Sequence, residues 1–179
     1  MEKLRKKLIK KIFVKYDFII YKNKEAVDIF CDIKIQKVNS ENVSDVLSFE
    51  NVEKLKNINR LIENRDIGYY AYYKLKCVHR SWVKLGPQEV NVIDKYSLKL
   101  GKDDIYIHYC ATARDFRGRN YYPAVLSYIS KKFPTKIKYI VTLTKKKSAN
   151  SSVRKAGFIP FKRIIYIRFF NKIWIKTII

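Results

Sequence analysis

The sequence predicts an α/β (α+β) fold in which a mixed, mostly antiparallel central sheet is flanked by helices. In several short segments apolar residues alternate with polar ones, which is the period of a strand with one buried face. In other segments apolar residues recur every three or four positions, which is the period of an amphipathic helix. No repeat, linker or low-complexity block divides the 179-residue chain. We therefore expect a single domain over residues 16–179.

A basic amphipathic helix is expected ahead of this domain, at residues 1–15. Leu4, Leu8 and Ile12 recur every four residues, and the same segment carries seven basic residues against Glu2. Two interpretations stay open. The helix lies on anionic lipid, or it docks on the domain and leaves its lysines in solvent.

The remaining elements follow from the same two periods. Ile29, Cys31, Ile33 and Ile35, for example, alternate with polar residues. In chain order the sequence predicts a strand at 28–38, one or two helices within 40–64, paired strands at 67–75 and 78–84, a less regular stretch to 103, a strand at 105–112, a helix at 120–133, a strand at 137–144, a short helix near 149–156, and terminal strands at 161–169 and 172–178.

The formal charge of +23 favours anionic partners, namely nucleic acid, an acidic membrane face or a phosphate-bearing ligand. No recognised nucleic-acid-binding module is present, which argues against nucleic acid. The three cysteines are scattered and show no metal-ligand spacing, so neither a disulfide framework nor a metal site is expected. No apolar run is long enough to span a bilayer, and Lys10 and Lys11 interrupt the apolar core that a signal peptide needs. We expect a cytoplasmic protein, in peripheral contact with an anionic membrane if the first helix binds lipid.

The most informative segment is residues 104–133. A strand runs into a turn that contains Arg117, Gly118 and Arg119, and a helix starts straight afterwards. The N-terminus of a helix has free backbone N–H groups and a partial positive charge, so this arrangement favours phosphate binding. Gly118 permits close approach of the backbone to a ligand. Taken alone, the turn is better explained as a solvated basic loop.

A second segment, residues 142–158, helps to interpret this turn. It reads as a strand, a polar turn and a short helix that ends at Gly157. Glycine in that position is typical of a left-handed helix terminator, with Phe158 folding back as its hydrophobic contact.

Together the two segments resemble the motifs of the GNAT superfamily of acyl-CoA N-acyltransferases, and within it members that modify cell-envelope sugars or peptides. The first motif aligns with the run Arg114-Asp115-Phe116-Arg117-Gly118-Arg119-Asn120-Tyr121-Tyr122-Pro123. The second is matched by Asn150, Ser152, Lys155, Gly157 and Phe158. The resemblance covers most of the chain, from about residue 28 to the end.

The resemblance implies that acetyl-CoA, or another acyl-CoA, binds as co-substrate in a V-shaped opening between two splayed strands. The acyl group would pass to a primary amine, such as an amino sugar or another small envelope precursor, without a metal. The implied cofactor contacts are the strand backbone of Cys110, Ala111 and Thr112, the amides of Arg117, Gly118, Arg119, Asn120, Tyr121 and Tyr122, and, near the thioester, Asn150 and Ser152.

Some positions depart from the family pattern. Asn120 and Tyr122 replace two glycines, although asparagine also adopts the left-handed conformation. Val153 stands where many members have a tyrosine that acts as general acid. The candidate bases are His108, on the strand before the cofactor turn, and His79, on a neighbouring strand. Tyr109 or a tyrosine of residues 69–73 would then serve as the acid. The alternative function is a catalytically inactive GNAT-like module that binds anionic lipid or nucleic acid, and the oligomeric state stays open.

Overall fold

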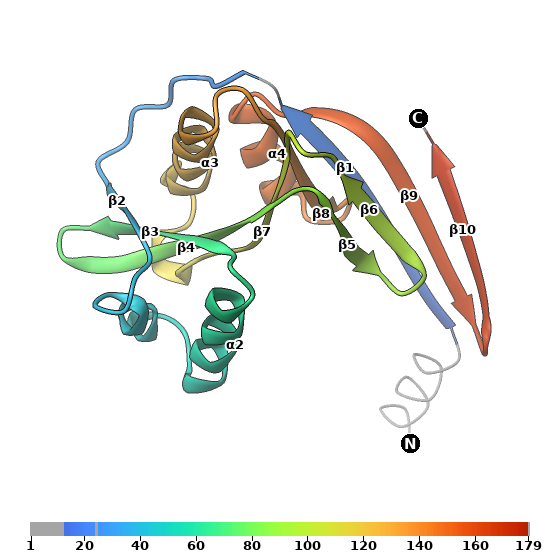
Figure 1. Ribbon diagram of the computed structural model, residues 1–179, viewed down its shortest axis with the longest axis horizontal. Coiled ribbons are helices and arrows are strands. Elements are labelled where there is room, and N and C mark those ends of the chain that lie inside the picture. The colour runs from blue at the N-terminus through green and yellow to red at the C-terminus, as the bar shows by residue number, and fades with distance from the viewer. Residues whose placement is uncertain (1–12, 24, 179) are drawn as a thin grey trace.

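The computed structural model describes residues 13–23 and 25–178. Within this part of the chain, eight strands form one sheet in the order β10-β9-β1-β8-β7-β4-β3-β2, and β5 and β6 form a separate hairpin (Figure 1). The elements are β1 (Phe13–Asn23), β2 (Lys34–Lys37), the 3-10 helix η1 (Val43–Ser48), α2 (Val52–Glu63), β3 (Ile67–Tyr73), β4 (Lys76–Leu85), β5 (Gln88–Ile93), β6 (Tyr96–Leu100), β7 (Asp104–Thr112), the 3-10 helix η2 (Arg114–Phe116), α3 (Tyr121–Lys132), β8 (Ile137–Leu143), α4 (Lys147–Lys155), β9 (Ile159–Phe169) and β10 (Lys172–Ile178).

The sheet is mixed and mostly antiparallel, as predicted. Among the described strands, every adjacent pair runs antiparallel except β7 and β8, which run parallel. This parallel pair lies in the middle of the sheet, next to the connection that passes through α3. None of the described helices is long and apolar enough to cross a bilayer.

Helices cover both faces of the sheet (Figure 1). On one face, α3 and α4 pack Leu126, Ile129 and Val153 against the inward residues of β7, including Ile105 and Ile107. The other face divides into two parts, because η1 and α2 cover Trp82 and Tyr70 whereas the β5–β6 hairpin covers Ile20 and Ile164. Neighbouring residues of a strand enter different cores, as the two-residue period requires.

Three predictions about local structure need correction. Phe13, Val14 and Lys15 were expected to end a helix, but they begin β1, which pairs with β9 and then also with β8. Pairing with β9 overrides the helical spacing of apolar residues here. The rest of the predicted helix, residues 1–12, lies outside the described residues. The strand expected at 28–38 contracts to Lys34–Lys37, and the stretch expected to be irregular contains the β5–β6 hairpin.

The left-handed conformation predicted for Gly157 is confirmed, and Asn120 adopts the same conformation, which asparagine permits. Gly157 has φ +83 and follows α4, where its N–H donates to the Arg154 carbonyl at 2.9 Å and the N–H of Phe158 donates to the Val153 carbonyl at 3.3 Å. This is a Schellman motif, and the Phe158 ring is buried against the helix as its hydrophobic contact. Asn120 has φ +61 and immediately precedes α3.

Candidate functional site

The sheet opens between β7 and β8. The two strands pair only from Asp104 to Ile107 on β7, against Ile137 to Ile140 on β8. Beyond that point β7 is bulged, because Tyr109 and Cys110 both lie opposite the single residue Ser81 of β4. The bulge bends β7 away from β8 and leaves the rest of both strands unpaired with each other.

Arg80 holds this bulge in place. Tyr109 has φ +51, a conformation that costs free energy for an aromatic residue. The buried guanidinium of Arg80 donates from Nη1 to the Tyr109 carbonyl oxygen and lies 3.8 Å from the centroid of the Tyr109 ring. Glu50 neutralises the guanidinium, with its Oε1 2.8 Å from Nη2 and 3.0 Å from Nε. The paired charge thus compensates for the strained backbone.

One cavity, which we call the helix-side cavity, lies beside the opening at the start of α3 and α4 and has a volume of about 500 Å³. It gathers most of the predicted cofactor residues, together with one predicted base. Those present are Cys110, Ala111, Thr112, Arg117, Gly118, Asn120, Tyr121, Tyr122, Ser152 and His79.

Two predicted cofactor residues do not line this cavity. The Arg119 guanidinium lies 5.2 Å from the centroid of the Phe116 ring. The Asn150 side chain is held by the backbone, since its Nδ2 donates to the Leu143 carbonyl at 2.9 Å, and its Oδ1 accepts from the Tyr21 hydroxyl at 2.9 Å. Asn150 therefore fixes the start of α4 against β8 and β1.

The N-terminus of α3 presents free backbone donors to the helix-side cavity. Within the described part of the chain, the amides of Gly118, Arg119, Asn120, Tyr121 and Tyr122 donate to no protein acceptor. The Asn120 side chain does not cap them, because its Oδ1 accepts from the Lys155 ammonium at 2.9 Å. A Cβ added to Gly118, which has φ +79, would meet nothing within 4 Å. The turn is thus an open, electropositive cradle suited to an anion.

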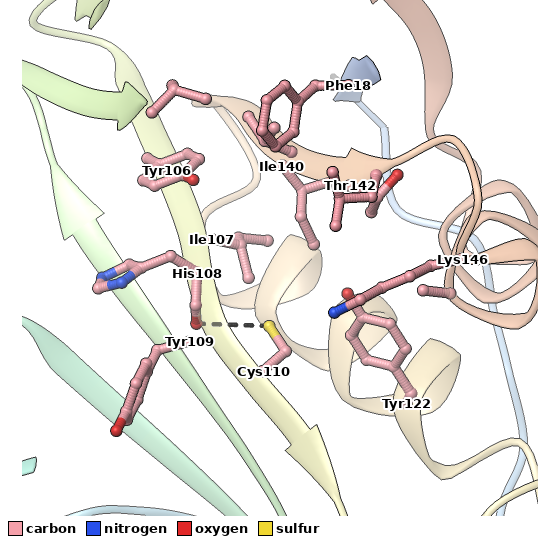
Figure 2. Close-up of a pocket in the computed structure, with 14 residues that line it drawn as sticks. Phe18, Tyr106, Ile107, His108, Tyr109, Cys110, Tyr122, Ile140, Thr142 and Lys146 are labelled. Carbon is pink, nitrogen blue, oxygen red and sulfur yellow. Dashed lines mark hydrogen bonds between the residues drawn. The ribbon is translucent and has the colours of Figure 1, made fainter. Parts of the chain in front are cut away.

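A second cavity, the hairpin-side cavity, lies against β7 and β8 and has a volume of about 310 Å³. Figure 2 shows its residues, among them Phe18, Tyr106 and His108. It shares four lining residues with the helix-side cavity: Cys110, Tyr122, Lys146 and Ala149. Because the hairpin-side cavity also contacts Val92 of β5, the opening passes from one face of the sheet to the other. We call the four shared residues the neck.

His108 lines the hairpin-side cavity and is paired with a buried carboxylate. Its Nε2 lies 3.1 Å from Oδ2 of Asp66, close enough for an ion pair although the two atoms are not aligned for a hydrogen bond. Asp66 also lies 3.1 Å from the Lys84 ammonium, and its side chain is 1% exposed. The imidazole stacks on Tyr106 with an interplanar angle of 3°. A carboxylate in this position fixes the orientation of the ring.

His79 has a different environment. Its Nδ1 lies 2.7 Å from the Thr112 hydroxyl and its Nε2 lies 2.8 Å from the Ser81 hydroxyl, so both nitrogens are engaged. Complete burial, and then the positive charge of Arg80, lower its pKa from 6.5 to about 3. The ring therefore stays neutral at pH 7 and is a weak base. These contacts make it a positioning residue that ties β4 to the splayed end of β7.

Two groups at the neck carry protons. Burial raises the pKa of the Tyr122 hydroxyl well above its usual value, so this group stays protonated and can donate. Burial also raises the pKa of the Cys110 thiol, which donates to the His108 carbonyl at 3.4 Å (dashed line in Figure 2).

Sequence reasoning missed Asp66, Arg80 and Lys146. Lys146 lies in a run of three lysines, and nothing in that run marks it as the residue that reaches the neck. Asp66 and Arg80 gain their roles only through contacts with residues distant in sequence.

The pKa of His79 predicts a pH-dependent stability. The unfolded chain takes up a proton near pH 6.5 whereas the folded chain does not until about pH 3, so stability is full above pH 6.5 and falls on acidification through that window. The slope is about 1.4 kcal/mol per pH unit for one proton. Urea unfolding from pH 7.5 to pH 4.5 should therefore show a shallower pH dependence for His79→Gln than for the wild type. Equal slopes would mean that His79 titrates normally.

We compared the sequence and the fold with those of known proteins. Neither a protein-family profile nor a curated protein matches the sequence. Among solved structures, a GNAT-family acetyltransferase from Colwellia psychrerythraea is similar, with TM-score 0.65 and 16% identity over 93% of this chain and 60% of that one. A putative GNAT acetyltransferase from Novosphingobium aromaticivorans gives TM-score 0.61 and 10% identity over 87% and 64% of the two chains.

A third similar structure is the GCN5-related glucosamine N-acetyltransferase region of a fungal multi-domain GH3 β-N-acetylglucosaminidase. It gives TM-score 0.63 and 11% identity over 94% of this chain and 23% of that one. This chain thus spans less than two thirds of each of the three solved chains. With the bulged strand, the splayed β7–β8 pair and the α3 turn, these likenesses show that the chain has the GNAT fold.

Proposed function

We propose that the protein is an acyl-CoA-dependent N-acyltransferase that transfers an acetyl or other acyl group to a primary amine. The observation that carries this proposal is the neck. There the anion cradle of α3 and a second, chemically distinct cavity adjoin through the sheet at Cys110, Tyr122 and Lys146. A reaction between two substrates needs such a meeting point, where the reacting atoms are held in contact and away from water.

The helix-side cavity fits the acyl-CoA. The free amides from Gly118 to Tyr122 would hold the pyrophosphate, and Arg117 and Lys155 add positive charge nearby. The splayed end of β7, residues 110–112, would offer backbone groups to the pantetheine arm, which then reaches the neck. This description keeps Asn150 as an anchor of α4 and not as a ligand.

The hairpin-side cavity fits the amine. In this proposal His108 takes a proton from the ammonium, and Asp66 stabilises the imidazolium that forms. The amine nitrogen then attacks the thioester carbonyl carbon, an amide bond forms and the carbon–sulfur bond breaks. Tyr122 donates a proton to the departing thiolate and regains one from the acylated nitrogen, a task for which Val153 has no suitable group. Lys146 adds positive charge at the position where the carbonyl oxygen becomes negative.

The walls of the hairpin-side cavity favour a small ring-shaped acceptor. Aromatic rings of Phe18, Tyr106 and Tyr122 line it, and none of its described lining residues is a carboxylate. A cavity without carboxylates does not suit a polyamine, whereas aromatic walls with His108 and Lys146 at their edge suit a sugar or a similar small amine. The likeness to a glucosamine N-acetyltransferase region supports an amino sugar as the first acceptor to test.

The charge of the cradle can be tested with two variants of the same size. Gly118→Asp places an anion in open space beside the pyrophosphate, whereas Gly118→Asn adds the same volume without charge and tolerates positive φ. Calorimetric titration with acetyl-CoA should show binding to the wild type, a modest loss in Gly118→Asn, and a loss of about tenfold or more in Gly118→Asp. If acetyl-CoA and longer acyl-CoAs fail to bind the wild type, the enzyme proposal is wrong. Equal loss in both variants would trace the effect to backbone strain.

The role of His108 is tested by His108→Asn. We expect acetyl-CoA affinity to stay near the wild-type value, because His108 lines the other cavity, and acyl transfer to fall by about 100-fold to 10,000-fold. Transfer is followed by release of the CoA thiol with amines chosen from an acceptor screen. Partial rescue by added imidazole would identify a lost base. Full activity in His108→Asn would remove His108 from the mechanism.

A further inference from the structure

The outer edge of the sheet carries an exposed surface that acyl transfer does not use. At the β9–β10 turn, Phe169 pairs with Phe13 of β1 on one side and with Lys172 of β10 on the other. Two positions further along, Ile167 lies between Lys15 and Trp174. Because side chains alternate along a strand, all of these residues point to the same side of the sheet. We call this set the outer face: Phe13, Lys15, Ile167, Phe169, Lys172 and Trp174.

The outer face and its turn are rich in exposed aromatic rings. The exposed fractions are 43% for Phe13, 46% for Phe169 and 50% for Trp174, and the turn residue Phe170 is 59% exposed. The Phe169 and Phe170 rings pack edge to face, with their centroids 4.7 Å apart. Phe170 has φ +49, a conformation that favours glycine or asparagine. Neither burial nor turn geometry explains a phenylalanine there.

The same edge is positively charged. Residues 159–178 contain five basic residues and no acidic one. On the adjacent strand Asp17 is neutralised by Arg163, with N–O distances of 2.9 and 2.6 Å. In the described part of the chain, Lys172 and Lys176 have no carboxylate partner. The sequence adds six basic residues against one acid in residues 1–12, which join β1 at Phe13, beside the turn.

We propose that the outer face and the β9–β10 turn bind the surface of an anionic lipid bilayer. Such a surface has an outer layer of anionic headgroups and, below it, a boundary with the acyl chains. Lysines without a carboxylate partner suit the first layer, and exposed Phe and Trp rings suit the second. The rings enter the boundary between headgroups and acyl chains, and the ammonium groups stay among the anionic headgroups. The chain would lie on the membrane through a β-hairpin edge, not only through the basic segment that precedes β1.

Two other occupants fit less well. A second copy pairing along β10 would bring its own Lys172 and Lys176 to the edge, and lysines there oppose edge-to-edge association. Single-stranded nucleic acid needs open ring faces along a basic groove. Here the rings of Phe169 and Phe170 pack against each other at a protruding turn.

The test is co-sedimentation of the full chain with phosphatidylcholine vesicles, with and without phosphatidylserine. Lys172→Glu/Lys176→Glu reverses the charge at both positions. Phe170→Asn/Trp174→Thr removes two rings, and its replacements suit their backbone, because asparagine tolerates a left-handed turn and threonine favours a strand. Lys56→Glu/Lys99→Glu, on α2 and β6, is the matched charge control. We expect binding only with phosphatidylserine, weakened about tenfold or more in both edge variants and nearly unchanged in the control.

Tryptophan emission should shift to the blue on binding and lose that shift in the variant without Trp174, since Trp82 is fully buried.

Several outcomes would overturn the proposal. The first is that the wild type does not bind phosphatidylserine vesicles, and the second is that both edge variants still bind them. The third is that the charge control loses as much binding as the edge variants, because net charge alone would then explain the binding. Edge variants that dissociate a dimer or abolish RNA binding, with no vesicle binding in the wild type, would assign the surface to one of those partners. Thermal unfolding like that of the wild type confirms that each variant is folded.

Discussion

The contact between the Arg80 guanidinium and the bulge at Tyr109 is the interaction on which the site depends. A regular β7 would continue its pairing with β8, and the sheet would have no opening. The bulge inserts one residue opposite Ser81 and forces Tyr109 to positive φ. Arg80 binds both the carbonyl and the ring of Tyr109, and Glu50 keeps that buried cation paired. The Arg80–Glu50 ion pair, on the face of the sheet that α2 covers, thus stabilises the opening between β7 and β8, which has a cavity on each face of the sheet.

The opening separates two kinds of chemistry. On the helix side, binding depends on backbone: a left-handed turn at Gly118 and Asn120 directs free amides at one place. On the hairpin side, the chemistry depends on side chains, with His108 held by Asp66 and stacked on Tyr106. Burial raises the pKa of the Tyr122 hydroxyl and of the Cys110 thiol at the neck, so both groups stay protonated and either can donate a proton. In the proposed reaction, the base therefore lies in the hairpin-side cavity and the acid lies at the neck.

The sequence allowed prediction of features that arise locally. The turn before α3, the left-handed Asn120 and the glycine stop of α4 depend on a few consecutive residues, and each appears as expected. β1 was missed because its strand character comes from pairing with β8 and β9, which a local period cannot show. The β5–β6 hairpin was missed because its strands are short and covered only when it folds over Ile20 and Ile164. His79 and His108 looked alike as candidate bases. Only burial and partners distinguish them, since His79 is held between two hydroxyls and His108 faces a carboxylate.

The most direct test of the central claim is to map coenzyme A on the chain by the chemical shifts of its backbone amides. If the opening holds the cofactor, the largest shifts will occur at residues 118–122 and 110–112, and will extend to Lys146 and Ala149 at the neck when acetyl-CoA replaces coenzyme A. Shifts confined to exposed lysines, or none in β7 and the α3 turn, would contradict the account and leave the opening without its proposed ligand.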